Sequence, residues 1–157
     1  MKEKQQVNIK VELINNYNYS EVSKYQFEVI ADIVLEGVKY GKDSAEISLL
    51  LCDDEFIKKL NAKYRGCDYP TDVLAFPMNE PDEIYDPVLG DIVISIDTAL
   101  KNIDYDRASL KFEVIYLFIH GILHLLGYDH EKSKEEESKM FNFQDILFDK
   151  CKHILEI

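Results

Sequence analysis

The sequence VIYLFIHGILHLLGY, residues 114–128, is the most apolar stretch of this chain. We expect it to lie in the core, with the rest of the chain packed against it. The stretch is shorter than the ~20 residues that a membrane-spanning helix needs, and it contains two histidines. We therefore predict that it lies within a buried helix over about residues 106–126. Gly127 is predicted to end this helix, because glycine adopts the left-handed backbone conformation at low cost.

The segments on either side of this helix predict an α+β fold, in which helices cover a small mixed β-sheet. Alternation of apolar and polar residues over 7–13 is typical of a strand with one buried face. Further strands are predicted at 45–52, 73–76 and 91–96, and further helices begin at the N-caps Ser20, Asp53 and Asp97 and at residue 133. Residues 77–89, rich in proline and acidic residues, are predicted to form an exposed loop.

The composition predicts one soluble globular domain over residues 1–157, because 46% of the residues are hydrophobic and 31% are charged. Thirty acidic and eighteen basic residues give a net charge of -12, which argues against a protein that coats nucleic acid or anionic membranes. The three cysteines (Cys52, Cys67 and Cys151) form neither a disulfide framework nor a CxxC motif, and the N-terminus does not resemble a signal peptide. A cytoplasmic location is therefore predicted.

The segment HGILHLLGYDH, residues 120–130, has the spacing of a metal site. His120 and His124 are four residues apart, so on a helix they lie on one face, one turn apart. The turn after the helix can bring His130 back as a third ligand. Three imidazoles suit Zn²⁺ and leave one position for water, as in catalytic sites, so we predict one zinc ion per chain. Asp129 is either a turn residue or a group that orients an imidazole or accepts a proton from bound water.

Two other interpretations of this segment remain open. The histidines could be ordinary core residues on a helix that a glycine ends. The pattern H-x-x-x-H-x-x-G-x-x-H is also that of the metzincin metalloproteases, in which a glutamate after the first histidine is the general base. Here that position is Gly121. The loss of this base argues against peptide hydrolysis without naming the substrate.

Three segments together resemble a single family. HGILHLLGYDH is similar to the signature of the YbeY family of bacterial endoribonucleases, NAKYRGCDYPTDVLAFP (residues 61–77) to its arginine-bearing loop and strand, and LGDIVIS (residues 89–95) to a second signature strand. The resemblance implies a zinc-dependent, single-strand-specific endoribonuclease that acts in 3′-end maturation of 16S ribosomal RNA and in ribosome quality control. It implies ribosomal RNA and the small ribosomal subunit as partners, without a DNA or membrane partner.

Carried over by position, the resemblance implies that His120, His124 and His130 bind zinc and that Arg65 lies in the substrate groove. We expect Arg65 to offset the charge that develops on phosphorus, because a guanidinium donates two hydrogen bonds to phosphate oxygens. A surface ion pair is the alternative role for this arginine. Glu113 is expected either to contact the site indirectly, through another side chain, or to complement the helix dipole as an acid of the first turn. The lysines 58, 59 and 63 are expected to form either a basic rim or a solvated helix face.

Three positions depart from the family pattern. Cys67 and Tyr69 stand where lysines are common, and Ala75 stands where a serine is common. Tyr69 is expected either to stack on a base, which is worth ~1–3 kcal/mol, or to pack on the surface. Cys67 is expected to be a free thiol, because a fourth protein ligand would fill the position of the metal-bound water.

Two alternative functions remain beside the endoribonuclease. One is a zinc-dependent metalloprotease or esterase of metzincin-like geometry, which Gly121 argues against. The other is a non-catalytic ribosome-associated factor, whose binding to RNA would survive the loss of the metal.

Overall fold

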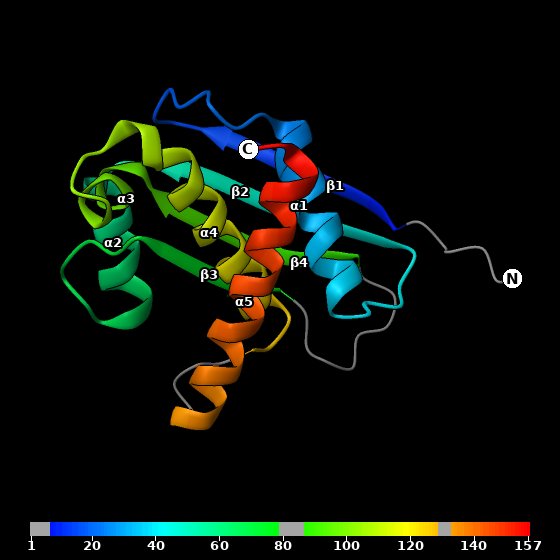
Figure 1. Cartoon of the computed structure of the whole chain (residues 1–157). Coiled ribbons are helices and arrows are strands. Elements are labelled where there is room, and N and C mark those ends of the chain that lie inside the picture. Colours follow the sequence, from blue (N-terminus) through cyan, green and yellow to red (C-terminus); the bar gives the residue numbers. More distant parts are fainter. Residues whose placement is uncertain (1–6, 79–86, 129–132) are drawn as a thin grey trace, which may run out of the picture.

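Figure 1 shows the computed structural model of the chain, which describes residues 7–78, 87–128 and 133–157. The strands are β1 (Asn8–Asn15), β2 (Ser44–Cys52), β3 (Val73–Pro77) and β4 (Val88–Ser95). The helices are α1 (Lys24–Gly37), α2 (Asp54–Arg65), α3 (Ile96–Asn102), α4 (Arg107–Leu125) and α5 (Lys134–Leu155). The predicted α+β fold, a single small domain, is confirmed.

The four strands form a mixed sheet in the order β1-β2-β4-β3. β1, β2 and β4 are parallel, whereas β3 runs antiparallel to β4. The two edge strands are therefore β1 and β3. Side chains alternate between the faces of β4, so that Ile92 and Ile94 join the larger core cluster and Val93 joins the smaller one. Both faces of the sheet are thus covered by apolar side chains.

The helices cover the two faces unequally. α1 and α4 pack on one face and α5 packs against both of them, while α2 lies on the opposite face (Figure 1). Phe27 of α1 and Phe118 of α4 meet edge to face, with 5.0 Å between ring centroids. On the other face, α2 contributes Ile57, which is fully buried against Leu74 and Val93. The larger core cluster therefore lies around α4.

The buried helix predicted from the apolar stretch is α4. Its N-terminus is capped by Asp106, and its last turn is followed by Gly127, whose φ of 95° is one that other residues rarely adopt. The predicted glycine stop is confirmed. By length and composition alone α4 could cross a membrane, but 56% of its most apolar window is buried inside the domain. This burial is what a core helix requires.

Three predicted boundaries are wrong. The N-cap of α1 is Ser23 rather than Ser20, because only Ser23 has the glutamine three residues later that completes a capping box. The N-cap of α3 is Ser95, whose side chain accepts a hydrogen bond from the helix, and Asp97 lies in the first turn. Strand β4 begins at Val88, earlier than predicted, because the residues before Asp91 already pair with β2 and β3.

Candidate functional site

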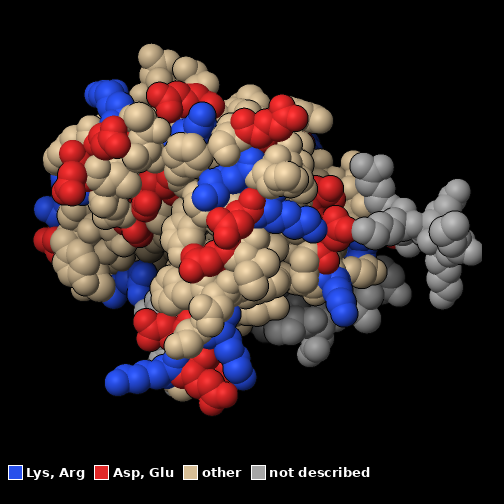
Figure 2. Space-filling model, in the orientation of Figure 1, with Lys and Arg blue, Asp and Glu red and all other residues tan. Residues whose placement is uncertain are grey.

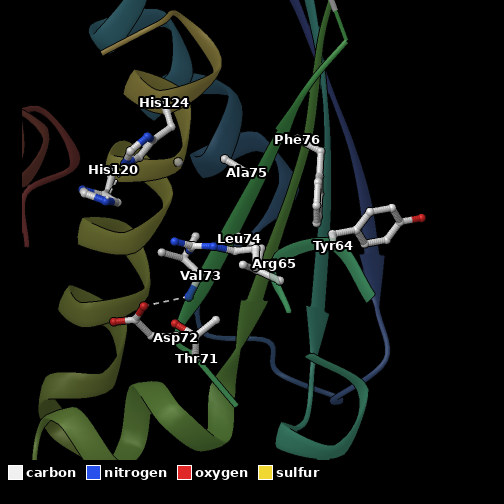
Figure 3. A pocket seen from close by; sticks show the side chains of 11 residues that line it. Tyr64, Arg65, Thr71, Asp72, Val73, Leu74, Ala75, Phe76, His120 and His124 are labelled. Atoms are coloured by element: carbon white, nitrogen blue, oxygen red, sulfur yellow. Dashed lines mark hydrogen bonds between the residues drawn. The ribbon is translucent and has the colours of Figure 1, made fainter. Parts of the chain in front are cut away.

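A cavity of about 630 Å³ lies along the outer edge of β3, between the C-terminal end of α2 and the C-terminal part of α4 (Figure 3). Three separate parts of the chain line it: Tyr64 and Arg65, then residues 71–76, and finally His120, Gly121 and His124. The cavity therefore joins the arginine-bearing segment to the histidine-bearing helix, which are far apart in the sequence.

His120 and His124 lie one turn apart on α4, and their rings point toward one another (Figure 3). The two Nε2 atoms are 3.0 Å apart. Two nitrogen lone pairs do not approach this closely unless a proton or a cation lies between them. Two nitrogens bound to one tetrahedral zinc ion at ~2.0–2.1 Å would be ~3.3 Å apart. The pair is thus close to the spacing that a shared metal ion needs.

The other two residues predicted for the metal centre, His130 and Asp129, lie outside the described residues. Within residues 7–78, 87–128 and 133–157, no group of three or more His, Cys, Asp or Glu side chains is arranged to hold a metal ion. The structure therefore brings together two of the three predicted ligands. The three-histidine centre stays a prediction.

Gln144 of α5 contacts this pair and was missed by the sequence analysis. Its side chain is fully buried, and its Oε1 atom is 2.9 Å from Nδ1 of His120. A signal was present in the sequence, because Gln144 interrupts an apolar stripe of the last helix that includes Met140 and Leu147. A polar side chain on a buried stripe indicates a polar partner, and here the partner is a predicted metal ligand.

Gly121 lies where α4 packs against β4. A Cβ atom at this position would be 2.8 Å from Cγ2 of Ile92 and 3.0 Å from its Cδ1, so any larger residue requires Ile92 to move. Glycine therefore permits the close approach of helix and sheet. The glutamate of the metzincin metalloproteases does not fit here, which gives a packing reason for the missing general base.

Arg65 ends α2, and the turn that follows it is fixed by two features. Gly66 takes the left-handed conformation with φ of 69° and caps the helix. Asn61 is buried, and its Nδ2 donates to the backbone oxygen of Tyr69 at 2.9 Å, which ties the following loop to the helix. A cation in the last turn also suits the helix dipole. Arg65 is thus held at the cavity by the end of α2.

The outer edge of β3 offers few hydrogen-bond donors. The N–H of Ser95 donates to the carbonyl of Asp72, and alternation along the antiparallel ladder then turns Val73, Ala75 and Pro77 away from β4. The N–H of Val73 donates to the carboxylate of Asp72 at 2.8 Å, and proline has no N–H. Within this strand, only Ala75 therefore turns an N–H toward the cavity without a partner among the residues that the structure describes.

Two carboxylates meet near the start of β3. Asn102 donates one hydrogen bond to Asp72 at 3.0 Å and one to Glu113 at 3.3 Å. Burial raises the pKa of Glu113 above its ordinary value; the hydrogen bond from Asn102 opposes this rise, and the charge of Asp72 adds to it. Glu113 lies beyond the first turn of α4, so the expected role as a first-turn acid is wrong. It does not line the cavity itself, but Asn102 joins it to Asp72, which does.

The aromatic side chain at the cavity is Tyr64 rather than Tyr69. Tyr64 packs edge to face against Phe76, with ring centroids 5.2 Å apart, and both residues line the cavity. Tyr69 is as exposed as Tyr64 but does not line the cavity. None of the three lysines of α2 lines the cavity either, and Cys67 is a free thiol as predicted. The cavity wall thus combines one cation with an aromatic pair.

The comparisons with known proteins agree on one family. A family model described as "Endoribonuclease YbeY" matches residues 3–152. A relative from Sulfurihydrogenibium sp. named endoribonuclease YbeY is 42% identical over 139 residues, which cover 88% of this chain and 90% of that protein. A relative of the same name from Aquifex aeolicus is 43% identical over 135 residues, covering 86% and 88%. The solution structure of TM1509 from Thermotoga maritima has a TM-score of 0.62 and 28% identity, over 94% of this chain and 91% of that one.

Proposed function

This chain belongs to the YbeY endoribonuclease family, and on that premise we propose that it is a metal-dependent hydrolase that cleaves phosphodiester bonds in single-stranded RNA. One observation carries the proposal: a single cavity holds an arginine suited to a phosphate and a histidine pair suited to a metal ion. The family relatives, named endoribonuclease, support the same activity.

The residues that would hold the metal are His120, His124 and, as the proposed third ligand, His130. One Zn²⁺ per chain is the proposed ion, because three imidazoles with one open position suit catalytic zinc. When bound, such an ion lowers the pKa of a coordinated water toward ~7 and so supplies a hydroxide at neutral pH. Asp129, next to the third ligand, is proposed to orient an imidazole or to accept a proton.

The other groups in the cavity are suited to bind and orient a phosphodiester. Arg65 is proposed to donate to two phosphate oxygens, and the outward N–H of Ala75 is one further donor on the same wall. A peptide that pairs with a strand edge needs alternating donors and acceptors, which the donor-poor edge of β3 does not provide. This edge favours a phosphodiester over the peptide of a metalloprotease. Tyr64, together with the predicted Tyr69, is proposed to stack on unpaired bases.

The charge distribution supports a substrate held at one place. The net charge is -12, and on the face drawn in Figure 2 the described acidic and basic side chains are interspersed, without a continuous basic surface. Such a surface disfavours binding of RNA over the whole protein regardless of its sequence.

We propose that the RNA is 16S ribosomal RNA near its 3′ end. We propose that the protein reaches it on the small ribosomal subunit in the cytoplasm, in maturation and in ribosome quality control. Residues 1–157 are proposed to act as one catalytic domain.

The test combines metal analysis with cleavage of an RNA fragment from the 3′ region of 16S ribosomal RNA, both single-stranded and annealed to its complement. His124→Ala is expected to lose the metal and to cut the single strand at least ~100-fold more slowly, since a metal ion contributes several kcal/mol to such reactions. His153→Ala is the matched control, because His153 is the histidine outside the motif and is exposed on α5.

Three results would overturn the proposal. Equal cleavage by the wild type and His124→Ala would indicate a contaminating nuclease. RNA binding without any cleavage, unaffected by removal of the metal, would indicate the non-catalytic ribosome-associated factor. Hydrolysis of peptides or small esters by the wild type, without cleavage of RNA, would indicate the metalloprotease or esterase.

A further inference from the structure

Gln144 is a buried polar residue that the proposed function does not use. It is fully buried on α5, which packs against α4 (Figure 1). Burying an amide without hydrogen-bond partners costs about 1–3 kcal/mol, so the partners of such a residue indicate why it is there. Both partners of Gln144 are on α4: Tyr116 and His120.

The two contacts fix which way the amide of Gln144 points. One end of the amide is 3.4 Å from the backbone oxygen of Tyr116. A carbonyl oxygen only accepts hydrogen bonds, so the Nε2 group of Gln144 must lie at this end and donate to it. The oxygen Oε1 therefore lies at the other end, 2.9 Å from Nδ1 of His120. The reverse orientation would place two oxygens against each other.

The orientation of this amide determines the tautomer of His120. Because Oε1 of Gln144 only accepts, Nδ1 of His120 must carry the proton. In a neutral imidazole the other nitrogen, Nε2, then carries the lone pair and is the acceptor. Nε2 is the atom that lies 3.0 Å from Nε2 of His124. The nitrogen directed at the second histidine is thus the one able to bind a metal.

The orientation of the ring is supported by a second residue of α5. The ring of Phe141 is stacked on that of His120, with 6.1 Å between centroids and 18° between planes. Phe141 and Gln144 are three residues apart and so lie on the same face of α5. One helix therefore contacts both the face of the imidazole and its Nδ1 edge.

We propose that Gln144 is a positioning residue, which selects the Nδ1-protonated tautomer of His120 and so presents Nε2 as a metal ligand. The metal-binding half of this inference rests on the proposed function, whereas the tautomer does not. Hydrogen bonds to the non-coordinating nitrogen of a histidine ligand fix its ring and raise its basicity, and their loss typically weakens metal binding by ~10–100-fold.

Two substitutions of Gln144 distinguish the effect of its hydrogen-bond acceptor, Oε1, from the effect of its packing. Gln144→Met keeps the length of the side chain but has no strong acceptor, whereas Gln144→Glu keeps an oxygen at the position of Oε1. The neutral acid can also donate to the carbonyl of Tyr116, as the amide does. Tyr116→Phe is the matched control, because it removes the hydroxyl bond to Asp145 at the same helix contact and leaves the carbonyl of Tyr116 in place.

Two quantities are measured in the purified full chain. The first is Zn²⁺ affinity, by competition with a chromophoric chelator, and the second is the tautomer of His120 in the metal-free protein, by ¹⁵N NMR of the imidazole nitrogens. We expect Gln144→Met to bind Zn²⁺ ~10–100-fold more weakly. Gln144→Glu should recover most of this loss, and Tyr116→Phe should bind as the wild type does. The wild-type spectrum should show the proton of His120 on Nδ1.

The inference is overturned if His120 of the wild type carries its proton on Nε2, or if folded Gln144→Met binds Zn²⁺ as tightly as the wild type. The wild-type spectrum and Gln144→Glu keep the test decisive if Gln144→Met does not fold. If the wild type shows the expected tautomer but binds no Zn²⁺, the proposed metal centre fails and the ligand role of His120 fails with it. The two proposals can therefore be distinguished.

Discussion

The two edge strands of the sheet protect their free backbone groups in different ways. At the β1 edge, the N–H of Val11 donates to the carboxylate of Glu28 at 3.2 Å, so the partner comes from helix α1. At the β3 edge, the carboxylate of Asp72 accepts from the N–H of its own neighbour Val73, and the N–H of Ala75 turns outward. Unprotected edges invite pairing with other strands. The partner of Val11 in β1 thus comes from another element, whereas the partner of Val73 in β3 comes from the adjacent residue.

Each edge also borders a hollow, but only one hollow contains the groups for phosphodiester chemistry. The hollow beside β1 has a volume of about 500 Å³, and its lining includes Glu28 and Asp32 but no histidine or arginine. Acidic walls repel a phosphate. The cavity beside β3 instead holds Arg65 and the histidine pair of α4. The difference teaches that an accessible edge becomes a site only where a helix brings reactive side chains beside it.

The largest effect on the difference between the two edges is expected from a substitution at position 121, beside the β3 cavity. Glutamate at this position is the general base of the metzincin metalloproteases. Gly121→Glu is expected to destabilise the protein by roughly 3 kcal/mol or more, because the new side chain overlaps Ile92 and places a carboxyl group in the helix–sheet contact. It should not create peptidase activity. Urea unfolding and a peptide cleavage assay check both points, with Gly121→Ala as the smaller substitution. A stable Gly121→Glu protein that hydrolyses peptides would contradict the packing argument.

The next largest effect is expected from the arginine at the β3 cavity. Arg65→Ala should slow RNA cleavage by roughly 10- to 150-fold, because a hydrogen bond to a charged group is worth about 1.5–3 kcal/mol. Arg107→Ala is the control, because the chain has only these two arginines and the charge of Arg107 acts on Tyr17 instead. The measurement is the initial rate at which each variant and the wild type cleave a single-stranded oligoribonucleotide. Equal losses in the two variants would show a general charge effect.

The hydrogen bond at the β1 edge can be tested through stability alone. Glu28→Ala leaves the N–H of Val11 without its acceptor and should lower the free energy of unfolding by about 1 kcal/mol. RNA cleavage at a temperature where the variant is folded should not change. Glu28→Gln keeps an acceptor oxygen and should lose less stability. Slower cleavage by folded Glu28→Ala would mean that the β1 edge contributes to function.

The smallest effect is expected at the carboxylate pair near the start of β3. The raised pKa of Glu113 means that the folded state favours its protonated form. Its contribution to stability is therefore fully present below the unfolded pKa of ~4.3 and is lost as the pH rises through the folded pKa. Glu113→Gln cannot ionise and should be more stable than the wild type at pH 7, by up to about 0.5 kcal/mol. Thermal unfolding at pH 7 and pH 4 checks this, and an unchanged difference at both would contradict it.

Features that depend on neighbours in the sequence could be predicted, and those that depend on packing could not. The length and apolar character of residues 114–128 predicted a buried α4, and Gly127 ended it as expected. Ser20 and Ser23 are equally good caps by residue type, and only the partner three residues later distinguishes them. The mixed sheet was expected from strands in the first part of the chain and helices in the last, but the order of the strands could not be predicted.

The same division applies to the site. The spacing of His120 and His124 places them together by helix geometry alone, and the arginine-bearing segment was identified by resemblance. Gln144 reaches His120 only because α5 packs against α4, a contact that no local pattern specifies. The donor-poor edge of β3 likewise depends on which strand lies beside it.

The strand order also affects when the site can form during synthesis of the chain. β3 precedes β4 in the sequence but lies outside it, so β3 has no place in the sheet until β4 has left the ribosome and paired with β2. The histidines of α4 follow later, and Gln144 later still. Contacts between distant segments form only after the intervening chain is available. An incomplete nascent chain therefore lacks the assembled cavity, because the arginine, the edge strand and the histidine pair come together only after β4 and α4 have been made.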